Sequence, residues 1–407
     1  MIRVLHIFAP TFGITFSGDS KLWVGLFQQW TDKSVIHKIL YVDDGVIVEP
    51  TTIKHAFGQK NSGNIPIIPR WRRAFWAIKL LWLFMFKKQD YAIIHVHTDY
   101  WGALLIGPFS ILICRPCVFH SVRMGEDDPS TIVKESFGFI KIWCYKRFDK
   151  VICISEALKQ EFLGQGFNER RVQLIVNAVN TEVFSPAQDN LSKLLIRHKL
   201  SLPANAHIVL SVGSIIPRKG TNLLVDAFMS LTKDYPNLLL LLVGPETRDE
   251  SASIDNEFVS SLQQKIKDAG ISNQVIFTGR IDHDFILADY YRASDIFAFP
   301  TYQEGLPNVL LEASSSSLPI IASHLSGSTD LIIKDGKTGY LVPVDDVIQL
   351  KMKLKYFLDN SEVGYKVGNA ARIYTVQKFG FETWQKNISQ TYSSLLNGSM
   401  TENITNV

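Results

Sequence analysis

Two carboxylates lie eight positions apart in the stretch PTYQEGLPNVLLEASSSSLPIIAS, which runs from Pro300 to Ser323. Glu304 stands just before the turn GLPN, and Glu312 follows within an apolar segment. Carboxylates accept hydrogen bonds from paired hydroxyl groups, such as those of a sugar or a ribose. The pair therefore indicates a ligand that carries hydroxyls at two separate places.

The segment between the two carboxylates is expected to bind phosphate. An apolar strand at Ile296–Phe299 precedes a helix expected at 308–315, with Pro307 in the first helical turn, where its missing N–H costs nothing. The N–H groups of Asn308 and Val309 then lack acceptors within the helix and point outward, an arrangement that attracts phosphate. A phosphate between two hydroxyl-binding carboxylates predicts a nucleotide sugar as the ligand.

Each carboxylate taken alone has a simpler interpretation. Glu304 fits a solvated loop residue. Glu312, four positions after Asn308 and so on the same face of the helix, fits a surface residue that balances the helix dipole. The combination of both acids with a helix start directly after a strand favours the ligand.

A second strand, expected at Ile208–Val212, leads into the loop GSIIPRKGT. Gly213 ends the strand where the backbone must pass close to another group, and Arg218 and Lys219 bring two cations to the same edge. The loop lacks the GxGxxG and GxxxxGK[ST] phosphate-binding patterns. Adjacent basic residues in a turn are usually solvated, but together with the helix start at Asn308 they predict a diphosphate clamp.

The composition is that of a globular chain. The 407 residues are 46% hydrophobic and 20% charged, which suits two or three domains with ample core. The formal net charge is +3, but residues 1–190 carry 22 Lys and Arg against 17 Asp and Glu, and the remainder carries 20 against 22. The basic first half suggests an anionic partner there, either a membrane surface or a phosphorylated substrate.

The four cysteines, at 114, 117, 144 and 153, are too few and too irregularly spaced for a disulfide framework, and we expect reduced core thiols. The N-terminus MIRVLHIFAP fits a strand and a loop rather than a signal peptide. The apolar runs Ala74–Phe86 and Gly102–Ile113 are too short to span a membrane. These features predict a cytoplasmic protein that contacts, at most, the inner face of a membrane.

Buried strands alternate with amphipathic helices along the whole chain. This pattern predicts an α/β fold of two Rossmann-like, doubly wound parallel-sheet domains facing across a cleft. The strands are expected at 4–8, 38–42, 92–97, 117–119, 151–154, 172–176, 208–212, 238–243, 275–278, 296–299 and 319–322. The helices are expected at 19–30, 73–86, 131–148, 156–163, 222–232, 257–267, 285–292 and 308–315. Ligands of such sheets bind beyond the carboxyl ends of the strands, where both loops described above are expected to lie.

The segment EGLPNVLLEA resembles the E-x7-E motif of the family 4 retaining glycosyltransferases, which have the GT-B fold. Four other segments are similar to the family, and together they extend the resemblance over nearly the whole chain: Val151–Pro186, SVGSIIPRKGTNLLVDAF, Gly327–Val342 and Phe379–Leu396. The match is most specific in the second half. It implies an acceptor-binding domain at 1–190, a nucleotide-sugar-binding domain at 191–378 and a helix at 379–398 that crosses back onto the first domain.

By this resemblance, Glu304 contacts sugar hydroxyls of the donor, Glu312 contacts the ribose, and Lys219 holds the diphosphate with backbone amides of the helix start. Glu304, Lys219 and His120 are the expected catalytic residues, with His120 near the donor sugar. The expected donor-binding residues are Gly18, Gly213, Ser214, Arg218, Gly244, Arg280, Gly305, Leu306, Asn308, Val309 and Glu312. The acceptor-binding candidates are His97 and Arg123.

Two positions depart from the family pattern. Ser17 replaces the first glycine of the pair that the family usually has beside the phosphates, so only Gly18 remains of it. Ser214 stands where the family often has arginine directly after the phosphate-loop glycine, and Arg218 is the cation that can take over this charge.

Histidine and aspartate pairs raise the question of a metal. His95 and His97 alternate at the end of a strand and so share one face, but the sequence shows no third ligand, and we expect a core role for His95 and a structural or acceptor-positioning role for His97. Asp282-His-Asp284 looks like the metal-binding D-x-D of the other major glycosyltransferase fold. The resemblance instead implies a metal-free site whose charge comes from Lys219, Arg218 and helix amides.

The resemblance implies sugar transfer from a nucleotide-diphosphate sugar with retention of configuration, in which the leaving phosphate oxygen takes the acceptor proton on the same face. No cofactor or metal is then required. Two alternatives remain open: a nucleotide-sugar epimerase of the same architecture, and a nucleotide-sugar-binding protein without turnover.

The segment RWRRAFWAIKLLWLFMFKK, residues Arg70–Lys88, has six cations and no acid. It fits either a helix lying in an anionic membrane interface or a core helix of the first domain. The basic first half favours membrane contact, and the acceptor is then expected to be a lipid-linked glycan, as in lipopolysaccharide, O-antigen or capsule synthesis.

Overall fold

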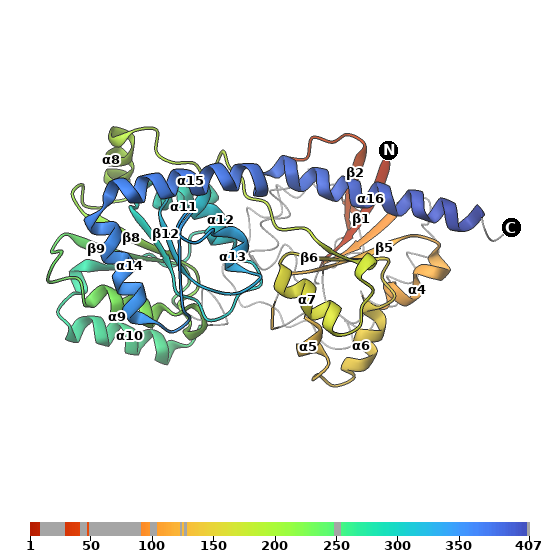
Figure 1. The fold of residues 1–407 in the computed structure, drawn as a ribbon, viewed down its shortest axis with the longest axis horizontal. Coiled ribbons are helices and arrows are strands. Elements are labelled where there is room, and N and C mark those ends of the chain that lie inside the picture. The colour runs from red at the N-terminus through yellow and green to blue at the C-terminus, as the bar shows by residue number, and fades with distance from the viewer. Residues whose placement is uncertain are drawn as a thin grey trace. The chain divides into compact units, whose positions relative to one another are not determined.

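The computed structural model describes residues 1–8, 29–40, 47–48, 91–97, 104–122, 124–125, 128–247 and 254–404. The chain divides into two compact units. Unit 1 contains Met1–Val176 and Phe381–Val407, and unit 2 contains Asn177–Gly380. Each unit is an α/β structure built on its own sheet, as Figure 1 shows.

Unit 1 is built on a seven-stranded sheet in the order β3-β2-β1-β4-β5-β6-β7. Its strands are parallel except for β3, which is antiparallel to β2. The strands are β1 (Ile2–Ile7), β2 (Val35–Leu40), β3 (Ile47–Val48), β4 (Ile93–Val96), β5 (Cys117–Ser121), β6 (Lys150–Cys153) and β7 (Val172–Leu174). Strands β4 and β5 are buried along their whole length, as is typical of strands covered on both faces.

The helices among the described residues of unit 1 are α4 (Ile106–Ile113), α5 (Pro129–Ile132), α6 (Gly138–Tyr145), α7 (Glu156–Gly164), the short η3 (Glu169–Arg171) and α16 (Phe381–Ile404). The prediction of one helix at 131–148 was wrong. The chain turns at Phe137, whose φ is 62°, and a Cβ on Gly138 would lie 2.0 Å from the carbonyl oxygen of Ile132. Residues 19–28 and 73–86 of two other predicted helices lie outside the described residues.

The C-terminal helix α16 packs onto unit 1. The hydroxyl of Ser389 donates to Asp32 at 2.8 Å, and that of Thr391 donates to the side-chain oxygen of Gln173 at 3.1 Å. Tyr392 is fully buried. Figure 1 shows this helix extending along unit 1, so the two ends of the chain complete one folded unit.

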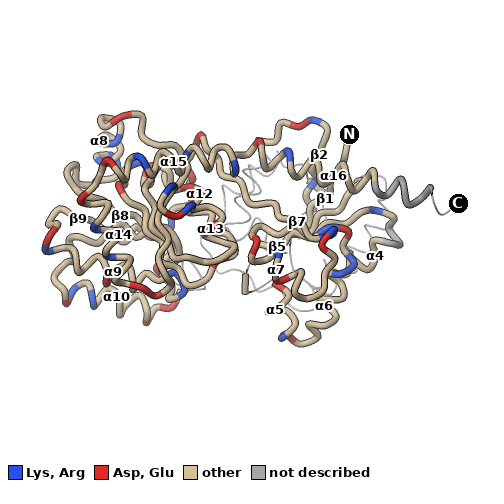
Figure 2. The backbone as a smooth tube through the Cα atoms, in the orientation of Figure 1, with Lys and Arg blue, Asp and Glu red and all other residues tan. Residues whose placement is uncertain are grey.

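Unit 2 is built on a six-stranded parallel sheet in the order β10-β9-β8-β11-β12-β13. The strands are β8 (His207–Val212), β9 (Leu238–Val243), β10 (Val275–Phe277), β11 (Ile296–Phe299), β12 (Ile320–Ser323) and β13 (Tyr340–Val342). None of these strands contains a Lys, Arg, Asp or Glu, and Figure 2 shows the charges of unit 2 on its helices and loops. The prediction of two parallel-sheet α/β domains is confirmed.

The helices of unit 2 are α8 (Asn190–Lys199), η4 (Pro217–Lys219), α9 (Thr221–Met229), α10 (Asn256–Asp268), η5 (Ser272–Gln274), α11 (Asp284–Ala293), α12 (Asn308–Ser315), α13 (Thr329–Ile332), α14 (Val347–Asp359) and α15 (Ser361–Phe379). The sequence patterns predicted α9 to α12 within two or three residues but missed α8, α14 and α15. Among the described residues, no helix is both long and apolar enough to cross a membrane.

Residues 177–189 pack with unit 2. The guanidinium of Arg292 donates to the carbonyls of Val183 and Ser185, and the N–H of Val179 donates to the carbonyl of Phe379 at 3.0 Å. The two compact units divide between residues 176 and 177, whereas the sequence placed the boundary between 190 and 191. The difference arises because these contacts bind the polar residues 177–189 to unit 2.

The strand order fixes where a ligand can bind. In unit 2 the connections run one way from β8 to β10 and the other way from β11 to β13, so the direction reverses between β8 and β11. In unit 1 it reverses between β1 and β4. Open α/β sheets bind their ligands beside such reversals, at the carboxyl ends of the strands.

None of the described cysteines forms a disulfide. Cys117, Cys144 and Cys153 are buried, as predicted. Cys114 is exposed because it ends α4 in a left-handed conformation with φ 52°, so its assignment to the core was wrong.

Candidate active site

Backbone contacts hold the loops after β8 and β11 together. Gly220 has a φ of 65°, and a Cβ there would lie 1.7 Å from the carbonyl oxygen of Pro300, so the approach requires glycine. The N–H of Tyr302 donates to the carbonyl of Arg218 at 2.9 Å. These contacts place η4 against the first residues of the loop after β11, on the two sides of the reversal in strand order.

Glu304 is the centre of a polar cluster in unit 2. Its Oε1 accepts hydrogen bonds from Nζ of Lys219 at 2.6 Å, from the hydroxyl of Thr301 at 2.9 Å and from Arg218 at 3.3 Å. The side chains of Glu304 and Lys219 are 10% and 18% exposed, against 44% for Arg218. All three hydrogen bonds from described residues end on Oε1 of Glu304. The second carboxylate oxygen, Oε2, can therefore accept a hydrogen bond from a ligand hydroxyl.

Lys219 is a largely buried cation held in one place. Burial lowers the pKa of its ammonium group, and the neighbouring Glu304 carboxylate opposes that shift. Its Nζ also lies 5.1 Å from the ring centroid of Phe299, within cation–π range. A cation fixed in a medium of low dielectric interacts with a diphosphate more strongly than a solvated lysine does.

The start of α12 has backbone donors to offer. Pro307 is the N-cap rather than a first-turn residue, one position from the prediction, and no side chain caps this helix start. Helix geometry leaves the N–H groups of Asn308 and Val309 without acceptors in the helix. The side-chain amide of Asn177 donates to the side-chain oxygen of Asn308 at 3.1 Å and orients it. The preceding residues, Gly305 and Leu306, are half-buried and buried.

A buried tyrosine orients Glu312. The hydroxyl of Tyr291, on α11, donates to Oε2 of Glu312 at 2.7 Å. Burial and the adjacent carboxylate raise the pKa of Tyr291 well above its usual value, so the hydroxyl stays protonated and remains a donor. The ring of Tyr291 meets that of Phe184 edge to face, with centroids 5.7 Å apart.

Replacing Glu312 by alanine is expected to weaken donor binding about ten- to a hundredfold while changing kcat little, because a charge-assisted hydrogen bond to a hydroxyl contributes roughly 1.5–3 kcal/mol. Tyr291→Phe should shift donor affinity in the same direction by less, since it removes only the group that orients the carboxylate. Calorimetric titration with the donor and steady-state kinetics measure both effects. Unchanged donor affinity in Glu312→Ala would remove this residue from the site.

Glycines bring three strand ends of unit 2 together. Gly213 and Gly244 have φ values of 147° and 146°, and a Cβ on Gly244 would lie 2.2 Å from the carbonyl oxygen of Gly213. The N–H of Gly244 donates to the carbonyl of Gly279 at 3.0 Å. Ser214, the residue after Gly213, is half-buried. The backbones therefore touch at the edge of the sheet, with no side chain between them.

The two candidate arginines pair with different acids. Arg218 lies at Glu304 and also donates to the carbonyl of Gln303. Arg280, in the loop after β10, donates to Asp282 at 2.8 Å. The structure thus brings Arg218, Lys219 and Glu304 into one cluster, while Arg280 belongs to the neighbouring strand-end loop.

The candidate histidines lie in unit 1. His120 is in β5 and almost fully buried, and burial lowers its pKa to about 3. His97 follows β4, with its ring centroid 5.5 Å from that of His120. The expectation that His95 and His97 have no third ligand nearby was wrong, because His6 lies beside them. Gly18 and Arg123 lie outside the described residues.

Three residues that were not predicted from the sequence contact the candidate residues: Thr301, Tyr291 and His6. Thr301 and Tyr291 fix the two carboxylates, and neither belongs to a local motif. A signal for His6 existed, since histidine recurs in four strands of the first half, at positions 6, 37, 95 and 120.

Two family descriptions match the chain. Residues 192–374 match the glycosyl transferases group 1, and residues 46–183 match glycosyltransferase family 4. Together they cover most of both units.

Curated proteins of several bacteria are similar to the chain. The UDP-Gal:alpha-D-GlcNAc-diphosphoundecaprenol alpha-1,3-galactosyltransferase of Escherichia coli is 26% identical over 293 residues, which are 70% of this chain and 69% of that protein. The capsular polysaccharide biosynthesis glycosyltransferase CapM of Staphylococcus aureus is 24% identical over 330 residues, 78% of this chain and 80% of that protein. The chain spans between about half and four fifths of the length of the curated relatives it matches.

Solved structures share the fold. Anabaena Alr3699/HepE, in complex with UDP and glucose, superposes with a TM-score of 0.74 at 19% sequence identity, over 97% of this chain and 100% of that chain. The two family matches, together with the segment EGLPNVLLEA, show that the chain belongs to the group 1, or family 4, glycosyltransferases. The two parallel sheets and the likeness to this solved structure show that it has the GT-B fold.

Proposed function

We propose that the chain is a retaining, metal-independent hexosyltransferase that moves a sugar from a nucleotide-diphosphate sugar to a hydroxyl of a lipid-linked glycan during synthesis of lipopolysaccharide, O-antigen or capsule. The main support is the pairing of Glu304 with Lys219 beside the uncapped start of α12. The names of the relatives point the same way: one acts on a diphosphoundecaprenol-linked sugar, the other serves capsule synthesis, and the solved neighbour holds UDP and glucose.

The proposed chemistry follows from where charge develops. Cleavage of the bond between the anomeric carbon and phosphate leaves extra negative charge on the nucleoside diphosphate. Lys219 and the amides of Asn308 and Val309 are the fixed positive groups that would meet it, and groups positioned in advance lower the barrier most. Glu304 would hold a donor sugar hydroxyl through Oε2 while keeping Lys219 in place.

The acceptor proton can leave without a side-chain base. In the proposed retaining reaction the acceptor attacks on the face from which the diphosphate departs, so a leaving phosphate oxygen is within reach of the acceptor hydroxyl. That oxygen gains charge as the bond breaks and becomes a suitable base. Bond formation to the acceptor and proton transfer to the diphosphate then balance the reaction.

Incubation of the purified chain with a panel of nucleotide-diphosphate sugars and glycan or lipid-linked acceptors tests this function. Transfer releases nucleoside diphosphate together with an elongated acceptor, both of which mass spectrometry detects. Conversion of one donor sugar into another without acceptor elongation would support an epimerase. Donor binding without either product would support a binding protein.

Transfer is expected to proceed without added Mg²⁺ or Mn²⁺, because Lys219 and the helix amides supply the charge that a divalent ion otherwise brings to a diphosphate. Asp282 accepts a hydrogen bond from Arg280, and both Asp282 and Asp284 are exposed. Rates measured in EDTA and after addition of either ion should agree within a factor of about two. Strict dependence on Mn²⁺, lost in Asp282→Asn, would contradict the proposed mechanism.

We further propose that the enzyme works at the cytoplasmic face of a membrane. Residues 70–88, whose cations and aromatic residues predict membrane contact, lie outside the described residues. A second surface supports it: the segment between α5 and α6 exposes Val133 and Phe137, and α6 exposes Phe139, Ile140 and Trp143. Figure 1 shows α6 and α16 on opposite sides of unit 1.

The surface of α6 has the chemistry of a membrane interface. Phe139 and Trp143 are four positions apart on α6 and so share one face, and Arg147 follows in the turn after the helix. The guanidinium of Arg147 lies 4.9 Å from the ring centroid of Trp143. Lys134 and Lys146 are also exposed nearby in the sequence. Aromatic residues among cations suit the headgroup region of an anionic bilayer.

The double variant Phe139→Ser/Trp143→Ser is therefore expected to lose most of its sedimentation with anionic liposomes. The matched control is Ile348→Ser/Met352→Ser on α14, which replaces apolar residues of similar exposure, 72% and 57%, and should bind like the wild type. Binding should rise with anionic lipid content and fall with salt. Equal binding by both double variants would exclude α6 from the membrane contact.

A further inference from the structure

Five histidines gather at one place in unit 1: His6 on β1, His37 on β2, His95 on β4, His97 just after it and His120 on β5. The parallel register pairs His6 with His95, and alternation along the strand puts His97 on the same face of the sheet. The place lies between β1 and β4, where the strand order of unit 1 reverses and ligands of such sheets bind.

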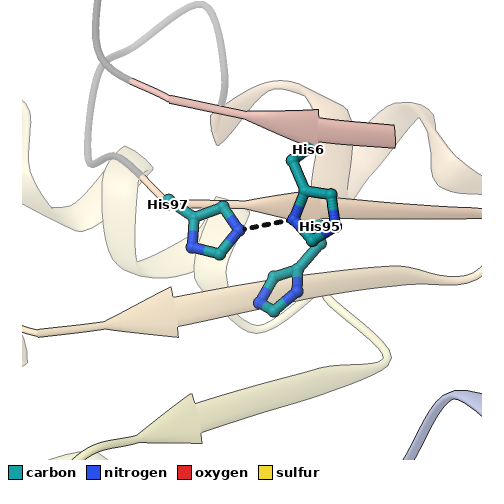
Figure 3. A group of neighbouring side chains, drawn as sticks. All are labelled: His6, His95 and His97. Carbon is teal, nitrogen blue, oxygen red and sulfur yellow. Dashed lines mark hydrogen bonds between the residues drawn. The ribbon is translucent and has the colours of Figure 1, made fainter. Parts of the chain in front are cut away.

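Three of these imidazoles converge. One ring nitrogen from each of His6, His95 and His97 lies within 4.8 Å of the others. Nδ1 of His6 is 2.9 Å from Nε2 of His97, and the ring centroids of His95 and His97 are 4.1 Å apart. Figure 3 shows the three rings side by side, with the contact between His6 and His97 dashed.

Two other side chains hold the rings from outside. Nε2 of His6 lies 2.8 Å from Nδ1 of His37, and Nδ1 of His95 lies 2.7 Å from the hydroxyl of Tyr392 on α16. Metal-binding imidazoles commonly use their second nitrogen for such a bond, which fixes tautomer and orientation. The contacts assign the inner positions to Nδ1 of His6, Nε2 of His95 and Nε2 of His97.

Two of the three rings lie in the interior of unit 1, since His6 and His95 are completely buried. The neutral imidazole is the form that binds metals, and imidazole nitrogens suit zinc and other first-row transition metals rather than Mg²⁺ or Ca²⁺.

We propose that His6, His95 and His97 bind one divalent transition-metal ion, zinc by the nature of the ligands, at the carboxyl edge of the unit 1 sheet. Zinc–nitrogen bonds of 2.0–2.1 Å in tetrahedral geometry separate the nitrogens by about 3.3 Å. The 2.9 Å contact between His6 and His97 therefore has to open by only a few tenths of an ångström. Three protein ligands leave a fourth position for water or another ligand.

This ion would be distinct from the donor chemistry proposed above. Its ligands come from β1, from β4 and from the residue that follows β4, and His95 contacts Tyr392 of α16, so the ion would connect the two ends of the chain within unit 1. A diphosphate instead takes hard, oxygen-binding ions such as Mg²⁺. The proposal of a zinc site and the proposal of sugar transfer without a divalent ion can therefore be tested separately, and either can be wrong without the other.

The test uses the full chain without a histidine tag, stripped of metal by a chelator and dialysed. Titration with Co²⁺ should produce the visible absorption bands of a tetrahedral nitrogen-ligated ion, saturating at one equivalent, and Zn²⁺ should abolish them by displacement. Elemental analysis after gel filtration should find one zinc per chain. Zn²⁺ should also raise the melting temperature, because it binds only the folded chain.

His6→Gln and His97→Gln keep a polar side chain of similar reach and should each abolish the cobalt spectrum and the thermal shift. Tyr392→Phe should retain the stoichiometry but lower the affinity for zinc about ten- to a hundredfold, which a merely structural tyrosine would not do. The control is His198→Gln/His283→Gln, two exposed histidines of unit 2, and should match the wild type.

Wild-type protein that shows no cobalt spectrum and retains no zinc would overturn the proposal, even if a variant fails to fold. So would a bound ion that survives in folded His6→Gln and His97→Gln, since it would lie elsewhere. In either case the cluster is a hydrogen-bonded chain of neutral imidazoles without a metal.

Discussion

Replacing Lys219 by alanine is expected to lower kcat about 10²–10³-fold, with a much smaller change in donor affinity. The departing diphosphate would lose a fixed cation at the moment when its charge increases, and the removal of one such group typically has this effect. The structure supports the size of the loss because the ammonium is largely buried and held at 2.6 Å by Glu304. Single-turnover kinetics with saturating donor separates the chemical step from product release.

The control for this prediction is Lys233→Ala, which removes an exposed lysine of the same unit and should leave kcat unchanged. Circular dichroism and thermal melting show whether each variant folds. Near-wild-type turnover by folded Lys219→Ala would mean that the developing charge is met elsewhere, and the proposed clamp would be wrong.

Replacing Glu304 by alanine is expected to be comparably severe. The carboxylate fixes Lys219 and Arg218 and is proposed to bind a sugar hydroxyl, so its loss affects both donor sugar and diphosphate. The effect should also depend on pH. Burial lowers the pKa of Lys219 and the carboxylate opposes this, so without Glu304 the pKa falls further and the ammonium loses its proton at lower pH. The deficit in kcat should therefore grow as pH rises.

A double-variant cycle separates the joint role of the two residues from their individual roles. If Glu304 acts largely through Lys219, the double alanine variant should be scarcely slower than either single variant, because residues that act as a unit are not additive. Glu362→Ala, at an exposed acid of unit 2, is the matched control and should behave like the wild type. Full additivity would show that Glu304 and Lys219 act independently.

Much of the fold could be predicted from local patterns. Strands such as β9 are uniformly apolar, which already indicates a parallel sheet buried on both faces, and α12 begins and ends at the predicted residues. The break between α5 and α6 could not be predicted, because the apolar periodicity continues through it. The turn depends on Phe137 adopting a positive φ and on Gly138 contacting Ile132.

The residues of the candidate site could be proposed from the sequence, but the contacts between them could not. Glu304 and Lys219 stand in strand-end loops and Glu312 in the helix that follows one of them, and parallel strands bring such loops to one edge of the sheet. The bond between Glu304 and Lys219 spans 85 positions, and that between Glu312 and Tyr291 joins two helices. Such pairings depend on the packing of elements, which local periodicity does not specify. His6 also has its partners on neighbouring strands, and the only sequence signal for it was the recurrence of histidine in four strands of the first half.

The most direct test of the central claim is the configuration of the product. The anomeric proton of the transferred sugar is to be followed by NMR, with a donor whose sugar–phosphate linkage has known configuration and the acceptor identified in the donor and acceptor screen. A retaining glycosyltransferase gives a new glycosidic bond with the donor's anomeric configuration, and wild-type enzyme should form it while Lys219→Ala forms it hundreds of times more slowly. A product of inverted configuration would contradict the proposed same-face mechanism.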